Sequence, residues 1–355
     1  MSELINLKKF WKGKKVFITG HTGFKGSWMC ILLNMLGAKI YGYSLKPNKK
    51  SLFNQAKCRK FLVKNTYANV KNFKFLNNQI KRSKPDLIFH LAAQPLVSEA
   101  FLKPHDTFKT NVEGTLNILE SIKTKNFIKS VVIITTDKVY KIKNSNKIYN
   151  ETDMLGGIEP YSVSKVCAEL ISKSYIETYF KNTNLRNRVS TARSGNVIGG
   201  GDYSLNRLIP DILKSKNSKK QLVIRNPNHI RPWQHVIEPT LGYLMLAEAQ
   251  YKGKLVNIKP CWNFGPNHNN FVKVRDIINL VKKKINIKIK LKKDQKFHET
   301  STLKLDSKKS KKILNWYPKW NLKSCIENIL EWDENYKKNK NVKKICENQI
   351  IKYFK

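Results

Sequence analysis

The chain has 355 residues, of which 41% are hydrophobic, and it carries a formal net charge of +43 at pH 7. This length allows one large domain or two of ordinary size, each with a buried core. No apolar run approaches the ~20 residues of a membrane-spanning helix, and no apolar segment near the N-terminus has the pattern of a signal peptide. We therefore expect a cytoplasmic protein without membrane insertion.

The spacing of the cysteines and the distribution of the lysines argue against two further classes of function. The six cysteines form no CxxC pair and no cluster with histidine, so neither a metal site nor a disulfide framework is expected. The lysines are spread along the chain among many asparagines and isoleucines. Nucleic-acid surfaces usually gather arginine and aromatic residues in one patch. We interpret the charge as a general substitution bias and expect no nucleic-acid partner.

The first predicted elements are a strand, a tight turn and a helix. Residues 16–19 suit a buried strand, Gly20, Gly23 and Gly26 follow, and apolar residues then recur at helical spacing up to Leu36. Free N–H groups and the positive end of the helix dipole would favour a pyrophosphate beside these glycines. The spacing is GxxGxxG, not the GxGxxG of the standard dinucleotide fingerprint. By itself the turn leaves a structural role and a cofactor role open.

Further strands alternate with helices up to residue 192. Strands are predicted at 39–44, within 61–72, at 85–91, at 131–134 and at 189–192, with helices at 104–123 and from 159 onward. This alternation predicts an α/β fold, a Rossmann-type doubly wound parallel sheet whose ligands bind at the carboxyl ends of its strands. The second strand lacks the acidic residue that often selects NAD, and Ser44 and Lys46 would suit a 2′-phosphate. Spacing alone therefore leaves NAD and NADP open.

Beyond residue 192 the alternation weakens, which predicts a smaller, mixed α/β substrate lobe towards the C-terminus. We expect 1–192, rejoined by about 231–262, to form the dinucleotide-binding domain, and 193–230 with 263–334 to form the substrate lobe. The segments 225–236 and 263–266 look like loops rich in hydrogen-bond donors. Residues 335–355 are rich in lysine and are expected to be peripheral.

A tyrosine and a lysine on the later helix could transfer protons. Tyr161 and Lys165 are four residues apart and share one helical face. An ammonium group beside a phenol lowers the pKa of the phenol from about 10, which would let Tyr161 accept a hydroxyl proton. Such a pair is also common on helix surfaces, and Thr136 and Asp137 also suit a strand end and a turn. What favours chemistry is the order of the glycine turn, residues 90–94, Asn111, Thr136, Tyr161 and Lys165.

This ordered set resembles the extended short-chain dehydrogenase/reductases, in which GxxGxxG binds a dinucleotide and Ser/Thr, Tyr and Lys perform hydride chemistry. Within that family, longer motifs resemble those of CDP-glucose 4,6-dehydratases, and the resemblance spans residues 15 to about 330. The motifs are GHTGFKGSW at 20–28, GYSL at 42–45, HLAAQPLV at 90–97, TTDKVY at 135–140, GNVIGGGD at 195–202 and IRPWQHV at 230–236.

The resemblance implies dehydration of CDP-D-glucose to CDP-4-dehydro-6-deoxy-D-glucose, for deoxysugar and O-antigen biosynthesis, with NAD taking hydride from C4 and returning it to C6. It implies that Tyr161, assisted by Thr136 and Lys165, removes the C4 hydroxyl proton. Asp137 would be the acid for the departing C6 hydroxyl. Lys138 stands where dTDP-glucose relatives have a glutamate, the C5 base. A lysine serves as a base only where its surroundings depress its pKa.

The resemblance also implies the binding residues. Those for NAD are Gly20, Thr22, Gly23, Phe24, Lys25, Gly26, Asn69, Val70, Leu91, Ala92, Ala93, Gln94, Asn111, Thr135, Tyr161 and Lys165. Those for the nucleotide-sugar are Gln94, Thr136, Asn196, Arg207, Arg225 and Arg231. Around the adenine, the family's Asp-Ile-Arg-Asp is replaced by residues 69–72, Asn-Val-Lys-Asn, so an amide would replace a carboxylate. A homodimer or dimer of dimers, paired through helices at 104–123 and 161–180, is implied as well.

Two alternatives remain at this point. The nearer one is another nucleotide-sugar 4,6-dehydratase or a 4-epimerase on the same scaffold, although Asp137 and Lys138 beside Thr136 disfavour an epimerase. The more distant one is a non-catalytic Rossmann protein that senses NAD(P) and binds a polyanion through its positive surface. The presence of Thr136, Tyr161 and Lys165 disfavours this second alternative.

Overall fold

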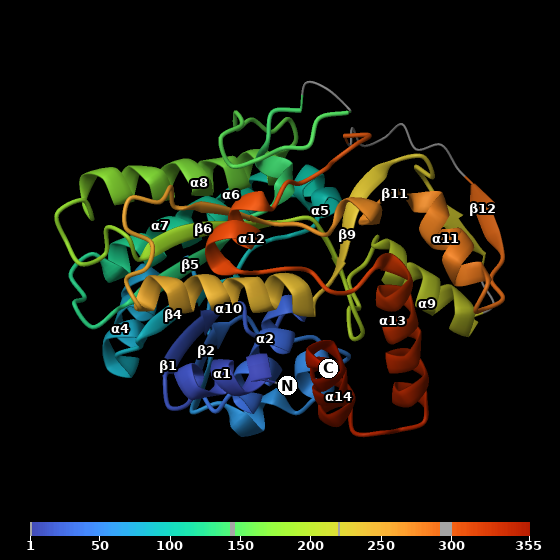
Figure 1. Ribbon diagram of the computed structural model, residues 1–355, viewed down its shortest axis with the longest axis horizontal. Coiled ribbons are helices and arrows are strands. Elements are labelled where there is room, and N and C mark those ends of the chain that lie inside the picture. Colours follow the sequence, from blue (N-terminus) through green and yellow to red (C-terminus); the bar gives the residue numbers. More distant parts are fainter. Residues whose placement is uncertain (1, 143–145, 219–220, 292–299) are drawn as a thin grey trace.

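The computed structural model describes residues 2–142, 146–218, 221–291 and 300–355. The main strands are β1 (Lys15–Thr19), β2 (Lys39–Ser44), β3 (Lys64–Tyr67), β4 (Leu87–His90), β5 (Ser130–Ile134), β6 (Val189–Ser194) and β10 (Cys261–Phe264). They form one parallel sheet in the order β10-β6-β5-β4-β1-β2-β3, with helices on both faces (Figure 1). The predicted doubly wound α/β fold is confirmed.

Two layers of helices bury the two faces of this sheet. The helices of the first layer are α1 (Ser2–Trp11), α2 (Phe24–Met35), α10 (Ile237–Tyr251) and α14 (Val342–Phe354). Those of the second are α4 (Phe73–Ser83), α7 (Gly114–Ile122) and α8 (Pro160–Thr178). Because side chains alternate along a strand, Val132 and Ile134 of β5 face the first layer, whereas Val131 and Ile133 face the second. Burial on both faces explains the continuous apolar runs of these strands.

The smaller lobe is built on short strands that lie beyond the carboxyl end of β6 (Figure 1). One three-stranded sheet contains β7 (Asn196–Ile198), β9 (Ile230–His235) and β11 (Phe271–Lys273), and β8 (Leu222–Ile224) pairs with β12 (Ile289–Leu291). The helices α9 (Leu208–Ser218), α11 (Val274–Lys282) and α13 (Leu322–Lys337) complete its separate apolar core. The remaining short helices are α3 (Leu52–Gln55), α5 (Val97–Leu102), α6 (Pro104–Phe108) and α12 (Lys308–Leu314).

Two segments that the sequence predicts as loops are strands in part, because β9 covers 230–235 of the first and β10 reaches 264 in the second. Polar residues obscure the strand pattern in both, but the polar side chains are buried and hydrogen-bonded. In β9, Gln234 Nε2 donates to Phe264 O at 2.7 Å. In β10, Asn263 Nδ2 donates to Tyr149 O at 3.2 Å and to Asp306 O at 2.9 Å. These partners are remote in sequence, so no local pattern reveals them.

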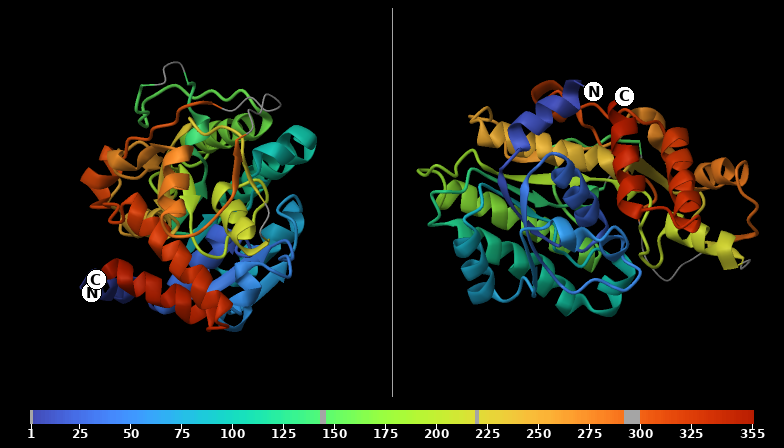
Figure 2. Two further views of the ribbon diagram at one scale, coloured as in Figure 1. Left: turned by 90° about the vertical axis from the view of Figure 1, so that its right-hand side faces the viewer. Right: turned by 90° about the horizontal axis from the view of Figure 1, so that it is seen from below.

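The C-terminal segment is not peripheral, contrary to the prediction from its lysines. Apolar residues of α14 recur at helical spacing, from Val342 through Ile345 and Ile350 to Tyr353, and all of them join the core under the large sheet. The lysines occupy the other side of this helix. Figure 2 shows that α14 brings the C-terminus next to the N-terminus. No helix in the described part of the chain is long and apolar enough to cross a membrane.

Candidate active site

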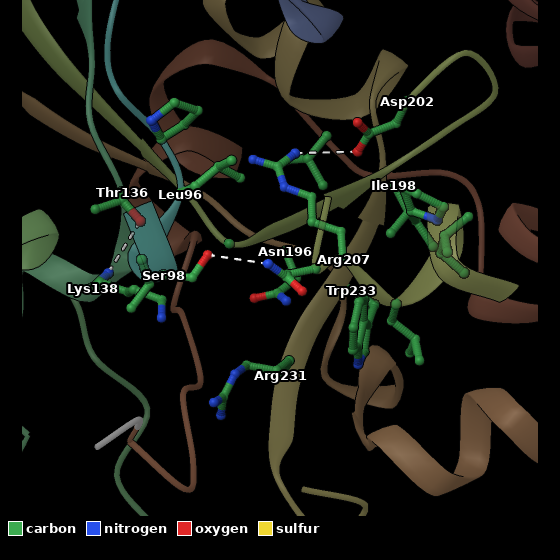
Figure 3. Close-up of a pocket in the computed structure, with 18 of the residues that line it drawn as sticks. Leu96, Ser98, Thr136, Lys138, Asn196, Ile198, Asp202, Arg207, Arg231 and Trp233 are labelled. Carbon is green, nitrogen blue, oxygen red and sulfur yellow. Dashed lines mark hydrogen bonds and ion pairs between the residues drawn. The ribbon is translucent and has the colours of Figure 1, made fainter. Parts of the chain in front are cut away.

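A cavity of about 390 Å³ lies where the carboxyl ends of the large sheet meet the smaller lobe (Figure 3). The predicted site residues that line it are Lys25, Leu91, Ala93, Thr135, Thr136, Asp137, Lys138, Tyr161, Lys165, Asn196, Arg207, Arg225 and Arg231. The predicted residues that do not line it are Gly20, Thr22, Gly23, Phe24, Gly26, Asn69, Val70, Ala92, Gln94 and Asn111. The five residues predicted to be catalytic therefore share one cavity.

The glycine turn between β1 and α2 has no room for side chains. Gly20 has a φ of +73°, and a Cβ on it would lie 2.6 Å from Ala92 N. A Cβ on Gly26 would lie 2.2 Å from Gly20 O. Gly23 is the N-cap residue of α2, and no side chain caps this helix. The backbone N–H groups in the first turn of α2 thus have no side-chain cap, which suits the diphosphate of a dinucleotide.

The end of β2 is fastened to the glycine turn. Thr22 Oγ1 lies 2.8 Å from Ser44 Oγ and donates to Leu45 O at 3.0 Å. The buried His21 ring fills the space above Gly42, where a Cβ would come within 2.6 Å of the ring. Its Nε2 lies 2.6 Å from Asn65 Oδ1. Sequence analysis missed this role of His21, for which the glycine at position 42 is the only local sign.

Gln94 and Asn111 hold the loop that follows β4. Asn111 Oδ1 accepts from Gln94 N at 2.8 Å, and Asn111 Nδ2 donates to Ser164 Oγ of α8 at 2.8 Å. The Gln94 side chain is engaged nearby, because its Nε2 donates to Thr107 Oγ1 at 2.8 Å. Asn111 occupies a π-helical turn at Lys109–Glu113, between α6 and α7. Such wide turns often mark functional sites, and this one places Asn111 beside the loop that follows β4.

Asn69 and Val70 lie beyond the carboxyl end of β3. Asn69 Oδ1 accepts from Lys71 N at 3.0 Å, so a contact from this side chain to adenine would use Nδ2. Val70 packs against Gly114, where a Cβ would come within 2.8 Å of Val70 Cγ2. Asn117 Nδ2 donates to Val70 O at 2.9 Å.

Tyr161 and Lys165 lie in the first turns of α8. Glu159 caps this helix, with Oε2 accepting from Tyr161 N at 2.7 Å. Burial raises the pKa of Tyr161 to about 12, and a hydrogen bond with Thr136 opposes this rise. Lys165 Nζ donates to Ile134 O at 3.1 Å. The prediction that the lysine lowers the phenol pKa is therefore wrong for the ligand-free chain, because loss of hydration at the phenol outweighs the favourable contacts.

Asp137 is the buried carboxyl group of the site. Its Oδ1 accepts from Thr136 Oγ1 at 3.0 Å, whereas its buried Oδ2 has no hydrogen-bond partner among the described residues. Burial raises the pKa of Asp137 above its usual value, although Lys138, Thr136 and Arg231 act in the opposite direction. A carboxyl group with a raised pKa and one oxygen that has no partner among the described residues suits a general acid.

Lys25 adds a buried amine to the cavity. Its Nζ donates to Ser194 Oγ at 2.9 Å, and burial lowers the pKa of Lys25 to about 7, helped by the charges of Arg207 and Lys165. Ser194 ends β6 and also lines the cavity, a role that the sequence analysis did not assign.

Arginines of the smaller lobe bring positive charge to the opposite wall (Figure 3). Arg231 of β9 is buried, and the distance from its NH2 atom to His229 Nδ1 is 3.1 Å. Arg207 pairs with Asp202 at 3.2 Å, and Arg225 NH2 donates to Asn206 Oδ1 at 3.1 Å. Three guanidinium groups around one cavity suit a diphosphate, which arginine binds through paired hydrogen bonds.

Known proteins are similar to this chain in both sequence and fold. The family model described as GDP-mannose 4,6 dehydratase matches residues 17–329. A CDP-glucose 4,6-dehydratase from Salmonella typhimurium is 40% identical over 334 residues, with 92% of each chain covered. A dTDP-D-glucose 4,6-dehydratase from Homo sapiens is 26% identical over 353 residues, with 94% of each chain covered.

Solved structures extend the comparison to the whole fold. A dTDP-glucose 4,6-dehydratase from Streptomyces venezuelae, solved with NAD and TYD bound, has a TM-score of 0.78 at 18% identity, covering 92% of this chain and 99% of its own. A dTDP-glucose 4,6-dehydratase from Bacillus anthracis, solved with NAD, has a TM-score of 0.75 at 22% identity, covering 92% and 98%. The likeness thus includes both lobes.

Proposed function

Because this chain belongs to the GDP-mannose 4,6-dehydratase family, we propose that it is an NAD-dependent nucleotide-sugar 4,6-dehydratase, a hydro-lyase that converts CDP-D-glucose to CDP-4-dehydro-6-deoxy-D-glucose. The observation that carries the proposal is the buried Asp137 carboxyl beside Thr136 and Tyr161 in one cavity. Elimination of water needs such an acid, which an epimerase does not. The 40% identity to a CDP-glucose 4,6-dehydratase supports CDP as the carrier.

When bound, NAD would accept a hydride from C4 of the sugar and return the same hydride to C6. The glycine turn supports this cofactor, because Gly20 and Gly26 let the backbone of the turn pack closely, and no side chain caps the N-terminus of α2. Leu91, Ala93, Thr135 and Lys165 line the adjoining wall of the cavity and would hold its nicotinamide half.

In the first half of the proposed reaction, Tyr161 takes the proton of the C4 hydroxyl as that carbon becomes a ketone. Thr136, hydrogen-bonded to the phenol, orients it. Only the phenolate form of Tyr161 can accept this proton, so the phenol must first release its own proton to solvent, and burial opposes that loss by raising the pKa of Tyr161. The ammonium of Lys165, one helical turn away, is the charge available to stabilise the phenolate.

In the second half, water leaves across C5 and C6. The C4 ketone acidifies the hydrogen on C5, and we assign its removal to Lys138, which lines the cavity. Asp137 donates its proton to the departing C6 hydroxyl, which its raised pKa favours. The neighbouring Thr136 hydroxyl keeps Asp137 Oδ1 in place while Oδ2 serves the leaving group.

The nucleotide end of the substrate would lie against the smaller lobe. Arg207, Arg225 and Arg231 surround that part of the cavity and suit the diphosphate, and Asn196 at the start of β7 adds an amide. Gln94 is engaged in its own loop, so we assign it a share in shaping the wall that faces the sugar.

We also propose a homodimer, or a dimer of dimers, in the cytoplasm. Apolar side chains stay exposed around α7 and α8, at Leu116, Leu170 and Tyr179. All six cysteines are free thiols, as a reducing compartment favours. Light scattering on the purified protein tests the assembly, and Leu170→Lys should yield monomers. We propose that the product of the enzyme, CDP-4-dehydro-6-deoxy-D-glucose, enters deoxysugar biosynthesis.

Mass spectrometry of three nucleotide-sugars tests the reaction. Purified protein with NAD is incubated separately with CDP-glucose, dTDP-glucose and GDP-mannose. Loss of one water from CDP-glucose alone, without net formation of NADH, is the expected result. Water loss from another substrate alone would replace the CDP assignment. No mass change, in protein shown to bind NAD, would favour a non-catalytic dinucleotide-binding protein.

A further inference from the structure

A buried ion pair lies directly behind the cavity, at a residue that no sequence motif marked. Glu169 follows Lys165 by one turn of α8, and its carboxylate accepts four hydrogen bonds. Arg193 Nε donates to Oε1 at 2.8 Å and Arg193 NH2 to Oε2 at 2.9 Å. Thr135 Oγ1 donates to Oε1 and Thr191 Oγ1 to Oε2, each at 2.6 Å. Both members of the pair are at most 4% exposed.

The pair continues as a chain of hydrogen bonds across the sheet. Arg193 NH1 donates to Tyr140 OH at 2.8 Å, and Tyr140 OH donates to Asn263 Oδ1 at 2.7 Å. The network thus joins α8 to the carboxyl ends of β5, β6 and β10. Buried ion pairs often add little stability compared with apolar residues of similar volume. The location of this pair therefore calls for a reason other than stability.

Two of the strands that the network joins, β5 and β6, deliver residues to the cavity. Thr135 immediately precedes Thr136 and Asp137, and Arg193 immediately precedes Ser194, which lines the cavity. We propose that Glu169 is a positioning residue of the active site, which fixes the ends of β5 and β6 to α8 and keeps Lys165 as an ammonium ion. This rests on the proposed function, because the part of a charged Lys165 in the reaction is to support proton transfer by Tyr161.

Charges around Lys165 support the electrostatic half of this role. Burial lowers the pKa of Lys165 to about 8, and Glu169 is the carboxylate that acts against this. From β4, His90 faces the lysine but is neutral, because burial lowers its pKa to about 3. From α2, Lys25 repels it. Tyr161, on the same helix, carries no charge while its pKa is raised. Removing the Glu169 charge should therefore make Lys165 lose its proton at lower pH.

The test compares three proteins. Glu169→Gln alone leaves a buried, unpaired Arg193, which can prevent folding. The informative variant is therefore Glu169→Gln with Arg193→Met, which removes both charges at similar volume. The control is Thr191→Val, which removes one hydrogen bond to the same carboxylate but leaves its charge. Circular dichroism verifies that each protein is folded.

The measurement is kcat for CDP-glucose against pH at saturating NAD. In the wild type we expect activity to fall on the alkaline side of about pH 8, where Lys165 loses its proton. In the double variant this limb should move about one pH unit lower, and in Thr191→Val it should stay. An unmoved limb in a folded double variant would show that Glu169 is only structural. Equal shifts in the double variant and the control would overturn the electrostatic role.

A second readout does not depend on the sugar. The Kd of NAD, from quenching of tryptophan fluorescence, should rise with the loss of the Lys165 charge, since a dinucleotide is anionic. Lys25 has a pKa of about 7, so its titration should weaken NAD binding near pH 7 equally in all three proteins. If the upper limb of NAD binding moves but CDP-glucose loses no water, the proposed reaction fails while the role of Glu169 stands. If CDP-glucose loses water but the alkaline limbs of kcat and of NAD binding both stay unmoved, the proposed reaction stands and the role of Glu169 fails.

Discussion

Thr136 Oγ1 donates to Asp137 Oδ1 at 3.0 Å, and the other oxygen of this buried carboxyl has no hydrogen-bond partner among the described residues. One hydroxyl thus orients the group proposed as acid and also contacts the phenol proposed as base at C4. Thr136 therefore contacts a residue proposed for each half of the reaction, Tyr161 for the oxidation at C4 and Asp137 for the loss of water.

Asp137→Asn should separate these halves. The amide keeps an oxygen for Thr136 but cannot donate the proton of a carboxylic acid, so kcat should fall about 10²–10⁴-fold. Removal of the C4 hydroxyl proton should persist, and absorbance at 340 nm in a single turnover should then show reduced NAD. Full water loss in this variant would exclude Asp137 as the acid.

The same substitution should stabilise the fold at neutral pH. Burial raises the pKa of Asp137 in the folded chain above that of the unfolded chain. The associated stability is fully present below the unfolded pKa and is lost as pH rises through the folded one. Urea unfolding at several pH values should show Asp137→Asn more stable than the wild type near pH 7, with the difference vanishing in acid. A constant difference would contradict the raised pKa.

Tyr161→Phe should abolish turnover and spare the cofactor site. The ring still fills its buried position, but the proton acceptor for the C4 hydroxyl is gone, so kcat should fall about 10²–10⁴-fold. The Kd of NAD should change little. Tyr317→Phe is the matched control, because Tyr317 is 55% exposed and lies outside the cavity. Intact turnover in Tyr161→Phe would remove the assigned role.

The glycine turn should tolerate added methyl groups unequally. A Cβ on Gly26 would lie 2.2 Å from Gly20 O, whereas one on Gly23 would lie 3.3 Å from the same atom. Gly26→Ala must displace backbone, so the Kd of NAD should rise more than about tenfold, a cost of about 1.4 kcal/mol. Gly23→Ala should cost less. Calorimetric titration with NAD ranks the two, and equal affinities would show that the turn does not form the cofactor site.

Glu238 should make stability depend on pH. Burial raises the pKa of this α10 carboxyl to about 7, and it accepts from Lys319 N at 3.0 Å and from the Tyr353 hydroxyl. Its contribution is fully present below pH 4.5 and is lost as pH rises through about 7. Relative to Glu238→Gln, the wild type should lose free energy of unfolding across that window. Glu248→Gln on the same helix is the control, and parallel curves would refute the prediction.

Local patterns in the sequence predicted much of this molecule. Apolar strands buried on both faces, the glycines at 20, 23 and 26, and the four-residue spacing of Tyr161 and Lys165 each depend on neighbours along the chain. The parallel sheet followed from the alternation of such strands with helices. The residues predicted to be catalytic were selected by their order along the chain and by the family resemblance, and Thr136, Asp137 and Lys138 among them follow the end of β5.

What the sequence did not reveal depends on partners far apart in the chain. Glu169 meets Arg193 only because β6 lies beside α8, and β10 accommodates the polar Asn263 because its side chain bonds to residues over forty positions away. The pKa of Tyr161 reflects its burial, which spacing does not report. Likewise, α14 looked peripheral from its lysines, although one side of the helix is apolar.

The position of β10 has a consequence during synthesis of the chain. This strand is the edge of the large sheet beside β6, yet β7, α9, β8 and β9 of the smaller lobe and the helix α10 must be translated before it. Until β10 leaves the ribosome, β6 presents an unpaired strand edge of the kind that recruits other chains. The nascent protein is therefore most prone to aggregate in that interval, and chaperones should be most needed then.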